Sequence, residues 1–213
     1  FRLKFIDQYN QDAVEKAFAE DTPKMVFIES PSNPVMRIAD IADIAARAKA
    51  VGAITVCDNT FLSPMLQQPL SLGADIVMHS TTKFLNGHSD VIGGCIVTNN
   101  EDILKDLDFW ANSLGVIGAP FDSFMTLRGM RTLELRVHRA EENARKIADI
   151  LNAHESIENV YYPGLPSHQG YEIAKKQQEG FGAMLSFTLK GGIDSVRKFV
   201  DALQVFRLAQ SLG

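Results

Sequence analysis

Two short apolar runs, each ending in side chains that can carry out chemistry, constrain this chain most. Residues 54–57 read Ile-Thr-Val-Cys and end at Asp58. Residues 76–78 read Ile-Val-Met and lead into the polar segment 79–83, His-Ser-Thr-Thr-Lys. A short apolar run before a polar turn is typical of a buried strand in a parallel sheet. Because ligands of such sheets bind at the carboxyl ends of the strands, we expect both polar segments to line one cleft.

The polar residues after these runs form a set that suits one cofactor. Lys83 is a primary amine that can form a Schiff base, and the hydroxyls of Ser80 and Thr82 can hydrogen-bond a phosphate. Pyridoxal phosphate needs such groups and an acid at its ring nitrogen, a role that Asp58 can fill. Taken alone, Lys83 is more simply a solvated amine and Asp58 a turn or capping residue. Their combination at strand ends favours the cofactor.

Two histidines, His79 and His88, lie close to this set and are nine positions apart. No pattern of carboxylates accompanies them, so the pair is a weak signal for a metal. We interpret both histidines as structural residues, or as residues that act through a neighbour, and we predict no metal site.

Composition excludes several classes of function. The net charge is −5 with acidic and basic residues interspersed, so no basic block indicates nucleic-acid binding. No apolar run is long enough to span a membrane. Cys57 and Cys95 lie inside apolar runs, which predicts buried thiols in a reducing, cytoplasmic compartment. The chain has 213 residues and starts at Phe1 in a predicted strand, so we expect it to be incomplete.

The alternation of predicted elements indicates an α/β fold with a mostly parallel sheet covered by helices. A smaller α+β part follows it, and we place the boundary near residue 145, giving domains 1–145 and 146–213. Two prolines exclude a helix from the loop 29–34. We predict strands at 3–6, 25–28, 54–57, 74–78, 91–98, 159–162 and 183–189, and helices at 12–19, 38–50, 101–114, 121–153 with a break near Gly129, and 193–203.

Several strings carry a resemblance that covers essentially the whole chain. The sequence resembles the pyridoxal-phosphate enzymes of cysteine and methionine metabolism, and within them the members that form cystathionine by γ-replacement. The strings are Glu-Ser-Pro-Ser-Asn-Pro at 29–34, Cys-Asp-Asn-Thr-Phe at 57–61, Ser-Thr-Thr-Lys-Phe-Leu-Asn-Gly-His-Ser-Asp at 80–90, Leu-Arg-Gly-Met-Arg-Thr-Leu at 127–133 and Gln-Gln-Glu-Gly-Phe-Gly-Ala-Met-Leu-Ser-Phe at 177–187.

The resemblance implies the large domain of the type I fold of pyridoxal-phosphate enzymes, followed by part of the C-terminal domain. It implies that Lys83 holds the cofactor and moves protons, and that Asp58 pairs with the ring nitrogen. Ser80 and Thr82 are expected to bind the phosphate, and Asn33 to hydrogen-bond the phenolic oxygen and face the substrate. Further contacts are expected from segments outside this chain and from a neighbouring subunit, in a homotetramer built as a dimer of dimers.

The same resemblance implies a substrate-binding loop at residues 208–213. There Ser211 is expected to help orient the lysine and the substrate, and Gln210 stands where a glutamate is usual in the γ-replacing members. We therefore expect formation of cystathionine from an O-acylated homoserine and cysteine. A cystathionine γ-lyase, an O-acylhomoserine sulfhydrylase and a catalytically silent binding or assembly protein on the same fold remain alternatives. The intact set of cofactor residues argues against the silent protein.

Overall fold

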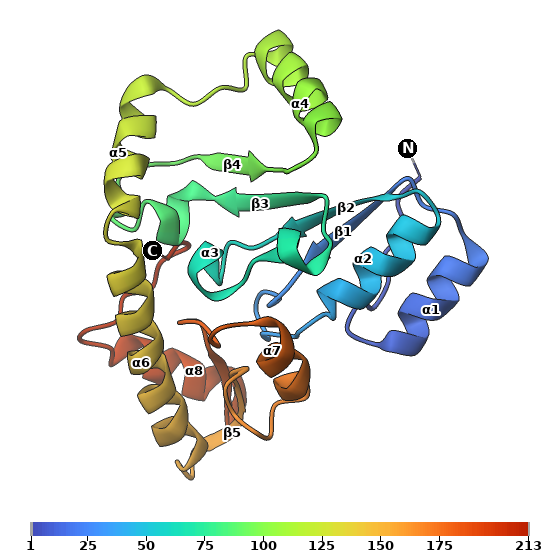
Figure 1. Cartoon of the computed structure of the whole chain (residues 1–213). Helices are drawn as coiled ribbons and strands as arrows, with labels where there is room; N and C mark the ends of the chain where they lie inside the picture. The colour runs from blue at the N-terminus through green and yellow to red at the C-terminus, as the bar shows by residue number, and fades with distance from the viewer. Residues whose placement is uncertain (1, 213) are drawn as a thin grey trace.

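The computed structural model describes residues 2–212, and its central feature is a four-stranded sheet (Figure 1). The strands are β1 (Met25–Glu29), β2 (Ile54–Asp58), β3 (Ile76–Ser80) and β4 (Gly94–Val97), in that order across the sheet. The first three are parallel, whereas β4 runs antiparallel to β3. The prediction of a mostly parallel sheet is confirmed.

Two helices, α1 (Gln11–Glu20) and α2 (Ile41–Ala50), pack on one face of this sheet (Figure 1). Side chains alternate along a strand, and this turns the fully buried Ile28 of β1 toward them. The second helix begins later than the predicted residue 38 because Asp40 caps it. The Asp40 carboxylate accepts a hydrogen bond from the Asp43 backbone N–H at 3.0 Å.

Short helical turns follow β2 and β3. Between β2 and β3 lie α3 (Ser63–Leu66) and a 3₁₀ turn, η1 (Pro69–Leu72). Directly after β3 comes a π-helical turn, η2 (Thr81–Leu85). Helix α4 (Glu101–Leu114) has the predicted bounds and ends at Gly115, whose φ of 69° is a conformation that glycine adopts readily.

The long helical tract consists of two helices, α5 (Pro120–Met130) and α6 (Leu133–Asn152), which meet just beyond Gly129. α6 runs through the predicted domain boundary without a break, and its buried Ala148 packs in one cluster with Tyr162. The division into 1–145 and 146–213 stays a prediction.

The C-terminal part contains a second sheet of two antiparallel strands, β5 (Ile157–Tyr161) and β6 (Ser186–Leu189). Helix α8 (Gly192–Asp201) lies near its predicted position. Helix α7 (Tyr171–Gln177) was not predicted, because only Ala174 of its seven residues is buried and no apolar stripe marks it. Within residues 2–212, no helix is long and apolar enough to cross a membrane.

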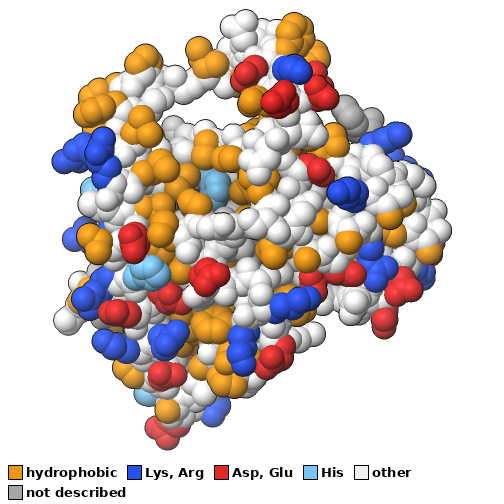
Figure 2. All heavy atoms as spheres, in the orientation of Figure 1, with side chains coloured by type: hydrophobic (Ala, Val, Ile, Leu, Met, Phe, Trp, Pro, Cys, Tyr) orange, Lys and Arg blue, Asp and Glu red, His pale blue; other side chains and the backbone are white. Residues whose placement is uncertain are grey.

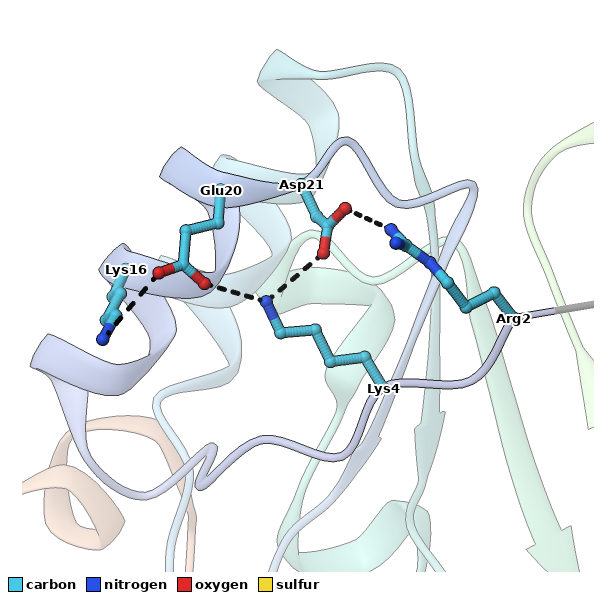
Figure 3. Close-up of polar contacts among 5 residues, drawn as sticks. All are labelled: Arg2, Lys4, Lys16, Glu20 and Asp21. Carbon is cyan, nitrogen blue, oxygen red and sulfur yellow. Dashed lines mark hydrogen bonds and ion pairs between the residues drawn. The ribbon is translucent and has the colours of Figure 1, made fainter.

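Several strand predictions need correction, and one of them, 183–189, is shortened to Ser186–Leu189. Residues 3–6 form no strand, because the sheet gives them no partner. Side chains tie this segment to the end of α1 instead: Arg2 pairs with Asp21, and Lys4 lies 3.2 Å from Glu20 and 3.3 Å from Asp21 (Figure 3). The strand predicted for 91–98 is shortened to Gly94–Val97. Its first residues instead contact the turn after β3, where the Thr81 N–H donates to the Gly93 carbonyl at 2.9 Å.

Candidate active site

The ends of three parallel strands meet at one edge of the first sheet. Glu29 of β1 lies beside Asp58 of β2, and Asp58 lies beside Met78 of β3. The loop that carries Asn33 follows β1, and the turn that carries Lys83 follows β3, so both leave the sheet at this edge. The carboxyl edge is where parallel α/β sheets bind their ligands.

Lys83 lies in the π-helical turn η2, and its backbone departs from helical geometry. Its φ and ψ are −91° and −129°. Such π turns are frequent at functional sites. The Lys83 Nζ donates a hydrogen bond of 2.6 Å to the Oγ of Ser211, although 128 positions separate the two residues. The lysine amine is therefore held by a hydroxyl from the end of the described chain.

Asp58 is half-buried and is fixed by the turn that follows it. Its Oδ1 accepts a hydrogen bond from the Thr60 backbone N–H at 2.9 Å. The Oγ1 of Thr60 in turn accepts from the Ser80 backbone N–H at 2.9 Å, which joins the ends of β2 and β3. Among residues 2–212, no basic side chain lies within ion-pair distance of Asp58. Its carboxylate is thus available to a cationic group of a ligand.

The two hydroxyls that are expected to bind the phosphate differ in their hydrogen bonds. The Oγ of Ser80 makes no hydrogen bond with any other described residue. The Oγ1 of Thr82 accepts from the Gly93 N–H at 3.0 Å and lies 3.3 Å from the Gly93 carbonyl oxygen, to which it donates. Ser80 can therefore donate directly to an anion, whereas Thr82 must first turn its hydrogen away from Gly93.

Comparison with known proteins gives a consistent result. Residues 1–213 match the family described as Cys/Met metabolism PLP-dependent enzyme, where PLP is pyridoxal 5′-phosphate. Over 213 residues the chain is 51% identical to cystathionine γ-synthase of Escherichia coli K12, covering 100% of this chain and 55% of that protein. The chain belongs to this enzyme family.

Two further proteins are similar to this chain over its whole length. A crystal structure of cystathionine γ-synthase from Xanthomonas oryzae pv. oryzae, in complex with aminoacrylate and cysteine, is 52% identical with a TM-score of 0.97. The match covers 100% of this chain and 55% of the chain in that crystal structure. Cystathionine γ-lyase of Dictyostelium discoideum is 46% identical over 100% of this chain and 54% of its own length. The chain thus spans about half the length of these relatives.

Membership in the PLP-dependent family implies pyridoxal 5′-phosphate as cofactor, and the residues present fit it. An amine, Lys83, and a carboxylate without a cationic partner, Asp58, leave the sheet at the ends of adjacent strands. Ser80, the last residue of β3, has a hydroxyl that makes no hydrogen bond with another described residue. This is the donor and acceptor set that a phosphorylated pyridine aldehyde requires.

Asn33 and Gln210 are both exposed and make no side-chain hydrogen bond with the other described residues. The backbone N–H of Asn33 donates to the Glu29 Oε1 at 3.3 Å. Burial raises the pKa of Glu29, the hydrogen bond from Asn33 opposes that rise, and nearby Asp58 adds to it. The expected contacts of Asn33 with the cofactor and of Gln210 with the substrate stay predictions.

An apolar cavity of about 950 Å³ lies between β3, β4 and α5 (Figure 2). Its lining includes Val77, His79 and Leu127, and it reaches the carboxyl edge at Asn59 and Thr81, but it contains neither Lys83 nor Asp58. His79 follows Met78 on the strand and therefore points to the face opposite Asp58. Burial lowers the pKa of His79 and favours its neutral form. We place the site at the strand ends because the reactive groups lie there.

Sequence reasoning did not single out Gln67 and Arg136. The Gln67 side chain is buried and touches both Ser30 and Asn59, and the Arg136 guanidinium contacts the carbonyl oxygen of Phe84, next to Lys83. No local sequence signal marks either residue. Each makes its contacts with segments that come close only in the folded chain.

Proposed function

We propose that the protein containing this chain is a cystathionine γ-synthase, which joins an O-acylated homoserine to cysteine with loss of the acyl group. The observation that carries the proposal is the gathering of Lys83, Ser211 and Asp58 at the carboxyl edge of a parallel sheet. Identities of 51% and 52% to two γ-synthases support the choice within the family by a small margin over 49% to a cystathionine β-lyase and 46% to the γ-lyase named above.

A γ-lyase or an O-acylhomoserine sulfhydrylase is the second candidate, and one residue favours it. Gln210 is a neutral amide at the position where a γ-synthase is expected to carry a glutamate. A carboxylate attracts the ammonium group of incoming cysteine more strongly than an amide does. The second half of the reaction is therefore where this protein would depart from a typical γ-synthase.

Each residue of the set has a distinct task in the proposed reaction. When bound, the cofactor supplies an electron sink that stabilises negative charge at the substrate Cα. Asp58 holds the ring nitrogen in its protonated form, and Ser80 and Thr82 hold the phosphate by hydrogen bonds. Lys83 Nζ carries protons between the substrate carbons, and Ser211 Oγ orients that amine by accepting its hydrogen bond.

We also propose that the protein acts in the cytoplasm as a homotetramer, with active sites shared between subunits. Two observations support this. Both cysteines are free thiols in the structure. α4, α5 and the loop between them expose large apolar side chains, among them Trp110 at 57%, Ile117 at 71% and Phe121 at 70%. The solution mass of the full-length protein, measured by light scattering, tests the assembly: four chains are expected, and a monomer would contradict the proposal.

The reaction is tested with the full-length protein and each of two esters, O-acetylhomoserine and O-succinylhomoserine, with and without cysteine. We expect cystathionine when cysteine is present, and 2-oxobutanoate with ammonia when it is absent. Cleavage of cystathionine without any synthesis from either ester would instead identify a lyase. Capture of sulfide in preference to cysteine would identify a sulfhydrylase.

A further inference from the structure

The turn that carries Lys83 is held from its outer side by an arginine of α6. The Nη1 of Arg136 donates to the backbone carbonyl of Phe84 at 2.9 Å, and its Nη2 donates to the carbonyl of Gly129 at 2.9 Å. Its Nε lies 3.1 Å from the Thr132 Oγ1. One planar guanidinium thus joins the residue after Lys83 to the end of α5.

The surroundings of Arg136 are unusual for an arginine. No Asp or Glu among residues 2–212 lies within ion-pair distance of it. Burial lowers the pKa of the guanidinium, and all of its hydrogen bonds go to uncharged oxygens. Fixed carbonyl partners define where a rigid, fork-shaped donor sits. The contact therefore sets backbone geometry and does not pair charges.

Two glycines make this contact possible. Gly87 has a φ of 70°, and a Cβ built on it would lie 1.8 Å from the Arg136 Nη1. A Cβ on Gly129 of α5 would lie 2.1 Å from the backbone oxygen of Asn86. Backbone and guanidinium are thus packed against each other without intervening side chains, so the turn has little room to shift.

We propose that Arg136 is a positioning residue for Lys83, an inference that rests on the proposed function of Lys83 as the cofactor lysine. Lys83 is then fixed at two ends: Arg136 holds the backbone one residue beyond it, and Ser211 holds its Nζ at 2.6 Å. Proton transfer depends steeply on the placement of the amine, because an error of about 1 Å can cost about 100-fold in rate. Substrate affinity depends on other groups and changes little.

The test compares Arg136→Gln with Arg139→Gln in the full-length, cofactor-loaded enzyme. Arg139 is a matched control on the same helix, since it is exposed and, among residues 2–212, pairs only with Glu142 at 3.2 Å. For Arg136→Gln we expect kcat to fall between about 10-fold and 100-fold while KM changes less than about threefold. The pH midpoint of the visible absorbance of the bound cofactor should shift as well. Arg139→Gln should keep the parental values in all three measurements.

The parent enzyme is first reduced with borohydride and its peptides are mapped. This separates the proposed function of Lys83 from the positioning role of Arg136. An adduct away from Lys83 overturns the proposed function and this inference together. If the adduct is on Lys83 and a folded Arg136→Gln variant keeps the parental kcat and absorbance midpoint, only the positioning role of Arg136 is overturned. If Arg136→Gln does not fold, Thr132→Val decides, because it removes the hydroxyl that contacts the Arg136 Nε. A fall in kcat with unchanged KM and a shifted midpoint support the role, and parental values overturn it.

Discussion

The carboxylate of Asp58 is held by its own turn and not by a cation. Its only hydrogen-bond donor within residues 2–212 is the Thr60 N–H at 2.9 Å. Thr60 also accepts from the Ser80 N–H, so the carboxylate and the turn of Lys83 are built as one unit. A charged group that is fixed in place and lacks a counter-ion is ready to pair with a cationic ligand atom.

Replacing this carboxylate should slow chemistry more than it weakens cofactor binding. Asp58→Asn keeps an oxygen for the Thr60 N–H but loses the charge that we propose stabilises a protonated ring nitrogen. We expect the barrier to Cα proton abstraction to rise by about 2–4 kcal/mol, with most of the cofactor retained. Exchange of the substrate Cα hydrogen, followed by NMR in deuterated water, measures the rate, and absorbance measures the cofactor content. Exchange at the parental rate would refute the role of Asp58.

Gln210 should affect how the reaction ends and not how it begins. Gln210→Glu restores a carboxylate for the ammonium group of cysteine, which we expect to favour the second step by about 1 kcal/mol, or close to tenfold. Flux should then move from 2-oxobutanoate to cystathionine, while loss of the acyl group proceeds at the parental rate. The measurement is the product ratio at fixed ester and varied cysteine. An unchanged ratio would remove Gln210 from the argument about specificity.

Among the elements, a buried amide ties the strand ends of the first sheet to α7. Gln67 is 1% exposed and donates from its Nε2 to the Ser30 carbonyl at 2.9 Å and to the Asn59 Oδ1 at 3.0 Å. Its Oε1 accepts from Gln177 at 3.3 Å and Gln178 at 3.1 Å. The loop after β1, the residue next to Asp58 and the end of α7 therefore share one side chain.

Removing this amide should destabilise the fold. Gln67→Leu keeps the side-chain size but leaves several buried polar groups without their partner, each at a cost of about 1–3 kcal/mol. We expect the free energy of unfolding to fall by at least about 2 kcal/mol. The neighbouring Gln68 is exposed, so Gln68→Leu is a matched control with an expected change within about 0.5 kcal/mol. Chemical denaturation of both variants decides, and equal stabilities would exclude Gln67 as a structural link.

Elements with a strong local signal could be predicted from the sequence. The strands 25–29, 54–58 and 76–80 are short apolar runs with polar ends, and α4 is capped by Asn100 at its start and Gly115 at its end. The strand prediction for residues 3–6 was wrong because a β-strand needs another strand to pair with. α7 was missed because it buries too little to create a periodic pattern.

For the site, the residue types could be predicted but the contacts between them could not. Lys83, Asp58 and Ser80 stand at strand ends, where the sequence alone identifies them as candidates. The hydrogen bond from Lys83 to Ser211 spans 128 positions, and the bond from Arg136 to Phe84 spans 52. Such contacts follow from how the helices pack on the sheet, and no local pattern encodes them.

For the molecule as a whole, the reactive side chains lie next to the apolar cavity but do not line it. The reactive groups gather at the edge of the sheet, whereas the cavity of about 950 Å³ is apolar and α4 and α5 expose large apolar side chains such as Trp110 and Phe121 (Figure 2). A large apolar surface on a folded chain usually makes contact with other protein. The chain covers 55% of the γ-synthase of Escherichia coli K12 and 54% of the γ-lyase of Dictyostelium discoideum, so these relatives contain further protein that such a surface could contact.

Covalent mapping shows directly whether Lys83 carries the cofactor. The purified full-length protein is incubated with pyridoxal 5′-phosphate, reduced with borohydride, digested and mapped by mass spectrometry. We expect a single reduced cofactor adduct on Lys83, with loss of the visible absorbance on reduction and no adduct in Lys83→Ala. An adduct on a different lysine of the parent protein, or no adduct on any lysine, would contradict it.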